Sequence, residues 1–317
     1  MIAKAFQQFN YTSIIVSSIL LLGVSYYYTT IDIKWYFVES KILNGILVFG
    51  SLMLSNYAID TVTRQLTIER SNRNAYHLLL YPLVIFSFPL ESLDMRFILG
   101  SAAIWSAWRN TRLFIETTNN QEKIKRLLDA VLLITISSLL ILENIFILIV
   151  PIIILFLGNI KRDIKFFIII IGTPIIIIPT ISVILSFLNL DNKLFSSYLF
   201  NTSEKLATSM VTDFGFQSSL WPLTLVIFYF LIAVIIKLRK TVGFQRRILD
   251  IIGVFFFFSL IIFFMMNQSI SGSEFHYLSL IIVYFIAQIF TKKISSIYVN
   301  LIFISLIVTT VTFKFII

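Results

Sequence analysis

Apolar segments of membrane-spanning length recur from one end of this 317-residue chain to the other. About 20 consecutive apolar residues are needed to cross roughly 30 Å of hydrocarbon as a helix, and a helix satisfies its own backbone polar groups there. Hydrophobic residues make up 58% of the chain and charged residues only 13%, a composition that excludes an ordinary soluble domain. The sequence therefore predicts an all-α, polytopic transmembrane helix bundle.

We predict a single integral membrane domain over residues 1–317, with about eleven spans and a range of roughly ten to twelve. The shortest pair meets at Glu143 and Asn144, so residues 145–159 form either a full span, a re-entrant hairpin or one of two tilted helices. The predicted spans cover residues 12–30, 42–59, 75–90, 95–115, 126–142, 145–159, 164–188, 218–237, 248–266, 273–290 and 295–314.

The Lys and Arg residues predict the orientation of these spans, because cations in short loops resist translocation and stay cytoplasmic. Nineteen of the 25 lie in alternate gaps between spans, and six lie in the others. This split predicts a cytoplasmic amino terminus and an external carboxyl terminus. The nineteen are Lys4, Arg64, Arg70, Arg73, Arg109, Arg112, Lys123, Lys125, Arg126, Lys161, Arg162, Lys165, Lys237, Arg239, Lys240, Arg246, Arg247, Lys292 and Lys293, and the six are Lys34, Lys41, Arg96, Lys193, Lys205 and Lys314.

The net charge of +9 follows from these loops. Because the cations are spread beside apolar spans and not gathered on a basic domain, the lipid bilayer, with its anionic headgroups, is the expected partner and nucleic acid is not. The longest external gap, residues 190–219, mixes polar residues with aromatic ones. That mixture predicts an interfacial helix lying along the membrane.

Several kinds of site lack the residues they need. The chain has no cysteine, so disulfides and thiolate metal sites are excluded. Its two histidines, His77 and His276, fall on different spans near opposite faces, which argues against a histidine-built metal centre. The glycine-rich nucleotide motifs and the sequence signatures of zinc proteases and serine hydrolases are also missing.

Residues 40–175 carry a series of motifs in a distinctive order. A polar linker, TVTRQLTIERSNRNAY, precedes an apolar span that ends FSFPLESLDMR, followed by LGSAAIWSAWRNTRLF and then by KRLLDA at residues 125–130. In this order the chain resembles an uncharacterised polytopic inner-membrane family of Bacteroidota, domain-of-unknown-function family 6427. The resemblance implies a multi-pass protein of a bacterial inner (cytoplasmic) membrane, and it implies no particular activity.

Acidic residues offer the main candidates for chemistry, because carboxylates are costly near a membrane interior. Asp32 lies in the first external loop, whereas Glu91 and Asp94 lie in the second, close to Arg96. An ion pair of these acids with Arg96 is the simplest structural interpretation. Further acids on the predicted external rim are Glu39, Glu143, Asp213 and Glu274, and Asp60, Asp129 and Asp250 lie at span ends on the cation-rich side.

The placement of acids in the first two external loops is similar to that in glycosyltransferases of the GT-C class, which use lipid-linked sugars. This resemblance implies that Asp32 acts as the catalytic base on an acceptor hydroxyl. It implies that Glu91, Asp94 and Arg96 bind the polyprenyl-linked sugar donor, and that Glu91 and Asp94 hold Mg²⁺ or Mn²⁺, which prefer oxygen ligands. The first external loop here is only about a dozen residues long, shorter than is usual in the class.

Three functions stay open on the sequence alone. A glycosyltransferase predicts acids around one external cavity with a side opening for a polyprenyl chain. A transporter of lipids or small molecules predicts a polar cavity at mid-membrane beside Pro174 and Pro179. A non-enzymatic subunit of an envelope assembly predicts an apolar groove or an aromatic face, such as residues 255–258, against another envelope protein.

The predicted orientation can be tested with a single introduced cysteine, because the chain has none of its own. Thr241 lies in a predicted cytoplasmic loop between Arg239 and Arg246. In intact cells, Thr241→Cys should resist an impermeant thiol reagent, whereas a cysteine placed within residues 192–212 should react. Strong external labelling at position 241 would overturn the assignment.

Overall fold

The structure, a computed structural model, describes residues 6, 10–31, 33–36, 40–66, 75–90, 92–157, 163–187, 221–240, 272–290 and 296–315. They are mostly helical, which confirms the predicted helical class. The helices are α2 (Tyr11–Thr30), α3 (Lys41–Leu66), α4 (Tyr76–Phe86), α5 (Met95–Glu116), α6 (Asn120–Leu140), α7 (Ile149–Leu157), α8 (Ile164–Phe187), α10 (Trp221–Lys240), α12 (His276–Ile289) and α13 (Ser296–Phe315), with the 3₁₀ helices η1 (Leu142–Leu148) and η3 (Ser273–Phe275).

Helices occupy the predicted apolar segments wherever the structure describes them. Some begin or end elsewhere than predicted: α3 continues to Leu66, into the polar linker, and α6 begins at Asn120, where the Asn119 side chain caps it. The predicted span 248–266 and the predicted interfacial helix within 190–219 lie outside the described residues.

Among the described residues, three helical segments are long and apolar enough to cross a membrane: Tyr11–Thr30, Lys41–Thr63 and Ile164–Ile184. Shorter apolar helices cover Tyr76–Phe86, Leu142–Phe156, Pro222–Val234, Ser273–Ala287 and Ile297–Thr312. The segment after Glu143 consists of η1 and the short α7. The count of about eleven spans and the orientation of the termini stay predictions.

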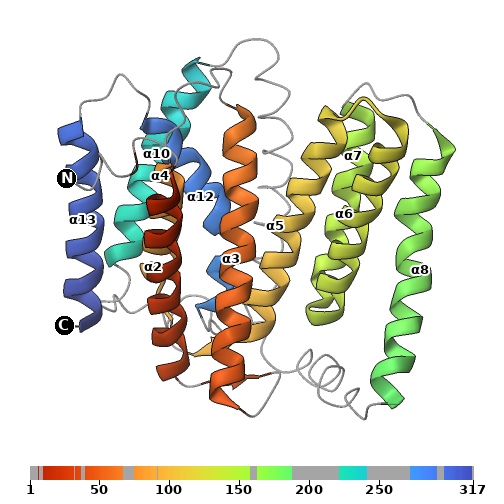
Figure 1. The fold of residues 1–317 in the computed structure, drawn as a ribbon, viewed down its shortest axis with the longest axis horizontal. Coiled ribbons are helices and arrows are strands. Elements are labelled where there is room, and N and C mark those ends of the chain that lie inside the picture. The colour runs from red at the N-terminus through yellow and green to blue at the C-terminus, as the bar shows by residue number, and fades with distance from the viewer. Residues whose placement is uncertain are drawn as a thin grey trace, which may run out of the picture. The chain divides into compact units, whose positions relative to one another are not determined.

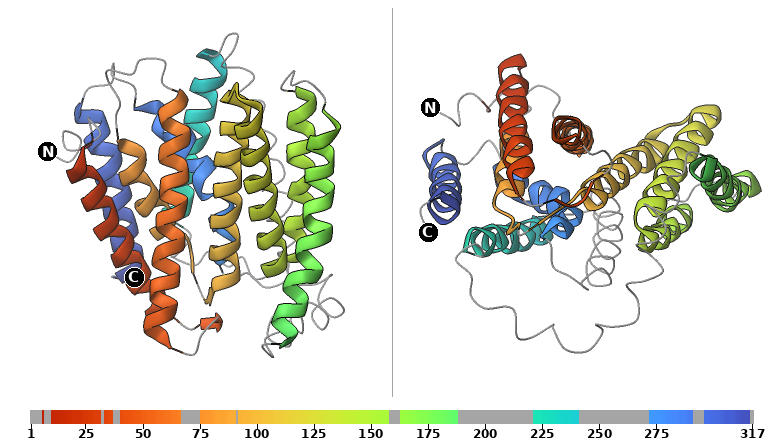
Figure 2. Two further views of the ribbon diagram at one scale, coloured as in Figure 1. Left: turned by 45° about the vertical axis from the view of Figure 1, so that its right-hand side comes forward. Right: turned by 90° about the horizontal axis from the view of Figure 1, so that it is seen from below.

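The chain divides into two compact units. The first comprises Met1–Ile98, Phe216–Arg246 and Ile270–Ile317, and the second comprises Leu99–Gly215 and Arg247–Ser269. The division falls within α5, whose first turn belongs to the first unit. The described helices of each unit run side by side, as Figures 1 and 2 show.

The first unit is built around α4. This helix has only 11 residues, and the residues from Tyr76 to Ile85 are all buried. Helices α2, α3, α12 and α13 pack against it, and α10 packs in turn against α12 and α13. Because α4 spans only about 16 Å at 1.5 Å per residue, its neighbours extend beyond it.

Helix α2 contacts its neighbours through small residues. Asn10 and Ser13 form a capping box at its start, with the Ser13 N–H donating to Asn10 Oδ1 over 2.9 Å. Further along the same face, Ser17 Oγ donates to the Leu78 carbonyl of α4, and Ser25 Oγ donates to the Gly45 carbonyl of α3, both over 2.7 Å. Small hydroxyl residues allow close helix approach and hydrogen bonding where lipid cannot satisfy polar groups.

A small parallel sheet joins the two segments predicted as external loops. Strand β1 (Ile33–Trp35) pairs with β2 (Leu93–Asp94), with Ile33 opposite Leu93 and Trp35 opposite Asp94. The sequence analysis predicted no strand here. The end of the first unit at which this sheet lies, beyond α2 and before α5, is called the sheet end below (Figure 2).

The second unit packs α6 against α8 and η1, and α7 against η1 and α8. Its core contains Phe114, Leu127, Val131, Leu155, Phe166 and Ile170. Polar contacts support the same arrangement, since Ser137 Oγ donates to the Gly100 carbonyl and Asn144 Nδ2 donates to Ser137 Oγ. Helix α8 stays continuous through Pro174 and Pro179.

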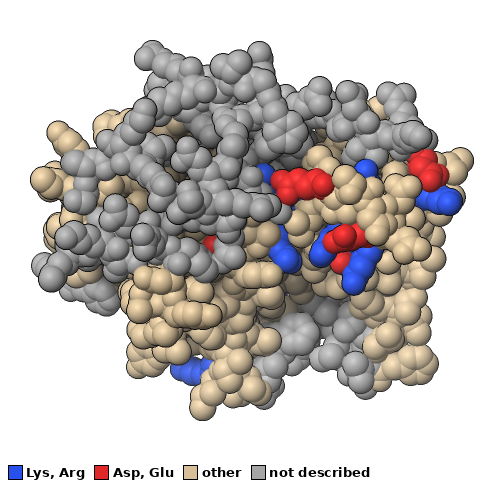
Figure 3. All heavy atoms as spheres, turned by 45° about the horizontal axis from the view of Figure 1, so that its top comes forward, with Lys and Arg blue, Asp and Glu red and all other residues tan. Residues whose placement is uncertain are grey.

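Charged side chains of the second unit lie where α5 ends and α6 begins. Arg112 pairs with Glu116 at 2.9 Å, and Arg126 pairs with Glu122 at 3.3 Å, both at i, i+4 spacing. On the face drawn in Figure 3, most of the visible described Lys and Arg side chains lie near Asp or Glu side chains.

One glycine of the first unit occupies a position that no other residue fits. Gly272 has φ of +85°, and a Cβ added there would lie 1.8 Å from the Pro89 carbonyl oxygen. The backbone at Gly272, just before η3, therefore lies directly against the backbone at Pro89, just after α4.

We expect Gly272→Ala to lower the free energy of unfolding by about 2 kcal/mol or more, because it adds left-handed strain to a steric clash. Thermal unfolding in detergent would measure the loss. Gly50→Ala is the matched control, since nothing lies within 4 Å of a Cβ added at Gly50 in the middle of α3. An unchanged melting temperature for Gly272→Ala would contradict the close contact between the backbones of Gly272 and Pro89.

Candidate functional site

Asp94 lies at the sheet end as a buried carboxylate held by a single arginine. Its exposed fraction is 1%. Arg96 Nε donates to Oδ1 over 3.0 Å and Nη2 donates to Oδ2 over 2.6 Å, while the Arg96 backbone N–H donates to Oδ1 over 3.1 Å. Asp94 thus caps the start of α5 and forms a bidentate ion pair, the stronger kind of charged hydrogen bond.

The sheet fixes this ion pair from two further sides. The Trp35 ring of β1 lies against the Arg96 guanidinium, with 5.5 Å from ring centroid to Cζ, a cation–π distance. The Asp94 backbone N–H donates to Ser273 Oγ over 3.1 Å, which ties β2 to η3. The side chain of Arg96 keeps 16% of its surface exposed, so the guanidinium stands at the border between the buried carboxylate and solvent.

The structure therefore brings together two of the predicted site residues, Asp94 and Arg96, in the ion pair that was the simplest structural interpretation. The other two, Asp32 and Glu91, lie outside the described residues, although their neighbours Ile33 and Ser92 are described. Their predicted roles stay predictions.

The predicted Mg²⁺ or Mn²⁺ site receives no support from the part of the chain that is described. No group of three or more His, Cys, Asp or Glu residues there could hold a metal ion. Both oxygens of Asp94 accept hydrogen bonds from Arg96, and Glu91 lies outside the described residues, so the metal site stays a prediction. Of the other external-rim acids, Glu274 is buried in η3, Glu143 is half-buried in η1, and Glu39 and Asp213 lie outside the described residues.

A second polar contact of the sheet end joins α2, α4 and α12. The Tyr28 hydroxyl donates to the Ile85 carbonyl over 3.0 Å and lies 3.2 Å from His276 Nε2. A phenol has one proton to donate, so His276 must carry its proton on Nε2 and donate to Tyr28. Tyr28 and His276 are both buried, which makes this a structural junction inside the helix packing.

An apolar groove of about 500 Å³ lies between α2 and α4. Its lining residues are Ile19, Leu20, Gly23, Val24, Tyr26, Tyr27, Thr30, Pro82, Leu83 and Phe86. Gly23 leaves space in the wall, because nothing lies within 4 Å of a Cβ built at that position. The volume is typical of sites for small molecules or single lipid chains and is too small for a partner helix about 10 Å wide.

The groove ends beside the sheet. The Tyr27 ring meets the Phe86 ring edge-on, with centroids 5.2 Å apart, and Thr30 is the last residue of α2. Four residues lie between Thr30 and Trp35, so the maximum reach of an extended chain places the Cα atom of Trp35 within about 17 Å of the Cα atom of Thr30, and the Trp35 ring in turn lies against Arg96. Aromatic residues are typical of the depth at which a membrane meets water.

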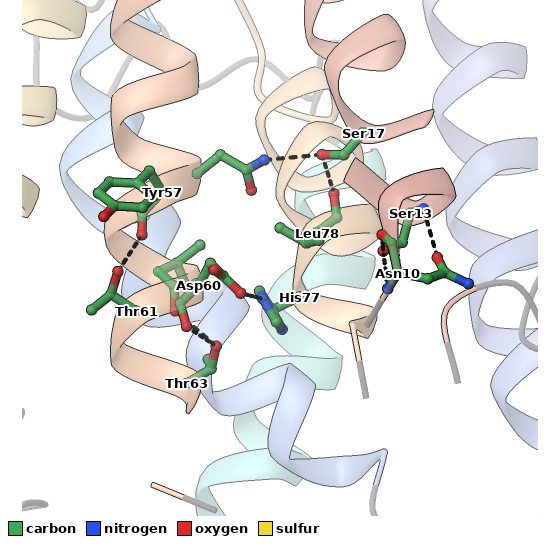
Figure 4. Close-up of polar contacts among 11 residues, drawn as sticks. Asn10, Ser13, Ser17, Tyr57, Asp60, Thr61, Thr63, His77 and Leu78 are labelled. Atoms are coloured by element: carbon green, nitrogen blue, oxygen red, sulfur yellow. Dashed lines mark hydrogen bonds and ion pairs between the residues drawn. The ribbon is translucent and has the colours of Figure 1, made fainter. Parts of the chain in front are cut away.

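A third polar site lies at the other end of α4 (Figure 4). His77 Nε2 lies 3.0 Å from Asp60 Oδ1 on α3, and the exposed fractions of the two residues are 2% and 5%. The sequence analysis placed Asp60 at a span end on the cation-rich side and considered His77 only as a possible metal ligand. Neither interpretation identified the pair.

A second set of hydrogen bonds, close to this pair in the sequence, joins α3, α2 and α4. Asn56 lies one turn before Asp60 on α3, and its Nδ2 donates to Ser17 Oγ over 3.0 Å. Ser17 in turn donates to the carbonyl of Leu78, the residue after His77 (Figure 4). Asn56 Oδ1 is buried and has no hydrogen-bond partner within the described part of the structure.

Comparison of the chain with protein families, with characterised proteins and with solved structures gives no match. The resemblances stated from the sequence motifs therefore stay predictions, and the site must be interpreted from its own geometry.

The Asp94–Arg96 pair makes a measurable prediction about stability. Arg96→Gln leaves the buried Asp94 carboxylate without its counter-charge, and we expect the loss to cost about 3 kcal/mol. Arg126→Gln, which breaks the exposed Arg126–Glu122 pair on α6, should cost only about 0.5 kcal/mol. Thermal or denaturant unfolding in detergent would compare the two. Equal effects would show that Asp94 is hydrated rather than buried.

Proposed function

We propose that this protein is a multi-pass inner-membrane glycosyltransferase of GT-C type, which takes a sugar from a polyprenyl-linked donor at the external face. In this proposal the sheet end faces outward and the amino terminus faces the cytoplasm. The apolar groove holds the first part of the polyprenyl chain, and the segments around β1 and β2 hold the sugar phosphate.

The observation that carries the proposal is the position of the groove. The lining of the apolar groove extends to Thr30, the last residue of α2, and strand β1 of the small sheet begins three residues later, at Ile33. A lipid-linked sugar needs this combination, because its chain must stay in an apolar environment while its phosphate and sugar stay in water.

Each residue of the site then has a chemical role. Arg96, oriented by Asp94 and Trp35, is suited to pair with the donor phosphate, since guanidinium groups recognise phosphate through fixed donors. Asp32 accepts the proton of the acceptor hydroxyl while the acceptor oxygen attacks the anomeric carbon of the sugar. The bond from that carbon to the phosphate oxygen breaks, and the polyprenyl phosphate leaves. Asp94 acts here by positioning Arg96, and no step is routed through a metal ion.

A non-enzymatic envelope assembly subunit is the second candidate. The groove between α2 and α4 is the observation that favours this candidate, because an apolar side chain of a partner protein fits a groove of this kind. The transporter alternative lacks a comparable observation, because α8 is an unbroken helix at Pro174 and Pro179, where a transporter site was expected.

The experiment compares carboxyl-to-amide variants in a deletion strain. If the proposal is correct, the strain lacks a sugar on an external glycan, and the wild-type gene restores it. Asp32→Asn should fail to restore it while reaching normal levels in the membrane, because loss of a general base typically costs about 10² to 10⁴ in rate. Mass spectrometry of the envelope glycans would measure the outcome.

Asp129→Asn is the matched control, because Asp129 is a partly exposed acid on α6 with no proposed catalytic role. Asp94→Asn is unsuitable as a catalytic test, since it also removes the charge that holds Arg96. Full restoration by a double variant, Asp32→Asn with Glu91→Gln, would contradict the enzyme and favour the assembly subunit.

A further inference from the structure

The second unit carries charged side chains that have no part in the proposed transfer reaction. Several of them lie at the end of the unit where α6 and α8 begin. We propose that Lys123 of α6 and Lys165 of α8 together hold the phosphate of one anionic phospholipid headgroup. These two residues are called the lysine site below.

The starts of α6 and α8 meet at one apolar core. Phe166, in the first turn of α8, lies edge-on against Phe114 near the end of α5, with ring centroids 5.4 Å apart. Leu127 of α6 belongs to the same buried cluster, and Val131 and Ile170 follow one turn further along each helix. Because α6 and α8 pack together and both enter the cluster near their starts, the two starts lie at the same end of the unit.

The two lysines lie at the border of this core. Lys123 is one turn before Leu127, on the face of α6 that packs into the cluster, and it is half-buried. Lys165 is next to Phe166 in the chain and is exposed. Packed helices lie roughly 8–10 Å apart, so the flexible four-carbon stems of two lysines on neighbouring helices can reach one phosphate group.

Both lysines keep their charge available, since neither forms an ion pair within the described part of the chain. The acids closest to them in the sequence have other partners: Glu122 accepts from Arg126 Nη2 over 3.3 Å, and Asp163 accepts from the Lys165 backbone N–H over 3.1 Å. Arg126 Nε is buried and has no hydrogen-bond partner among the described residues. This end of the unit therefore has cationic donors to spare, and such donors form strong hydrogen bonds with phosphate.

An apolar surface beside Lys165 indicates that the phosphate is that of a lipid. Ile164, Ile168, Ile171 and Ile175 follow one another at intervals of three or four residues along α8, and each is between 56% and 73% exposed. At 3.6 residues per turn, Lys165 lies between this exposed face and the side of α8 that enters the core. A lipid can therefore lay its acyl chains along α8 while its phosphate meets the lysines, whereas a soluble phosphate makes only the second contact.

The lysine site lies at the end of the unit whose loops are predicted to be cytoplasmic. Two further cations of that loop, Lys161 and Arg162, lie outside the described residues. Anionic lipids give the cytoplasmic leaflet its negative surface potential, which attracts basic residues beside membrane spans. A headgroup bound at the lysine site holds the start of α8 at the depth of the lipid phosphates.

Lipid retention by the purified full-length protein tests the proposal. The protein in a neutral detergent would be titrated with phosphatidylglycerol, which is anionic, or with phosphatidylethanolamine of the same acyl chains, which has no net charge. Native mass spectrometry would measure the fraction of protein that carries a bound lipid. We expect phosphatidylglycerol to be retained in preference, and millimolar inorganic phosphate to leave it bound.

Two single variants of the site are compared with a matched control. Lys123→Gln and Lys165→Gln should each weaken the binding of phosphatidylglycerol about fivefold, the effect of one basic residue near a headgroup. Lys125→Gln removes the same charge from the same turn of α6, but position 125 is about 200° around the helix from position 123, so binding should stay unchanged. The melting temperature of each variant shows that it is folded, because a lysine outside the described ion pairs contributes little stability.

Any of four results would overturn the proposal. The first is equal retention of the two lipids, and the second is the same loss in Lys125→Gln as in Lys123→Gln, which would indicate a diffuse effect of charge. The third is displacement of the lipid by inorganic phosphate, which would assign the site to a soluble anion. The fourth is loss of phosphatidylglycerol in Gly23→Phe, which would place the lipid in the groove of the first unit. The glycan assay of Asp32→Asn is separate from all four, so the two proposals can fail independently.

Discussion

Helix α4 sets the main constraint on the first unit, because it is a helix without an exposed face. Each residue from Tyr76 to Ile85 is buried, and α2, α3, α12 and α13 pack against the helix. In an apolar environment the polar groups of α4 that its own backbone does not satisfy must find partners elsewhere in the protein. They do so at both ends: His77 meets Asp60 of α3, and the Ile85 carbonyl accepts from Tyr28 of α2. The packing of four helices and two polar sites thus depends on this one short segment.

The groove is a consequence of the same packing. Serines of α2 contact α3 and α4, whereas Gly23 and the exposed Ile19 of the same helix line the groove opposite Pro82 of α4. The lining of the groove includes the aromatic pair of Tyr27 and Phe86 and extends to Thr30, three residues before strand β1. The groove between α2 and α4 offers a site for an apolar chain, and Arg96 at the start of α5 offers a cation near solvent, the two features that the proposed use of a lipid-linked donor requires.

Much of the helical framework could be predicted from the sequence, because long apolar segments separated by charged loops determine where helices form. The Asp94–Arg96 pair was also predictable, since two residues of separation place the partners together. The Asp60–His77 pair was not: the two residues flank a polar linker, and nothing in their spacing shows that α3 and α4 bring them within 3.0 Å. The pairing of β1 with β2 and the groove at Gly23 are likewise tertiary features, set by which helix faces meet rather than by local pattern.

The most direct test of the central claim is to ask whether the groove binds the chain of a polyprenyl phosphate. Purified protein in detergent would be mixed with a polyprenyl phosphate, and native mass spectrometry would measure the bound fraction. Gly23→Phe fills the groove, whereas Gly50→Phe adds the same bulk to an exposed part of α3, where nothing lies within 4 Å of the added Cβ. The account predicts that Gly23→Phe loses the bound lipid while Gly50→Phe retains it. Equal binding by both variants would contradict it.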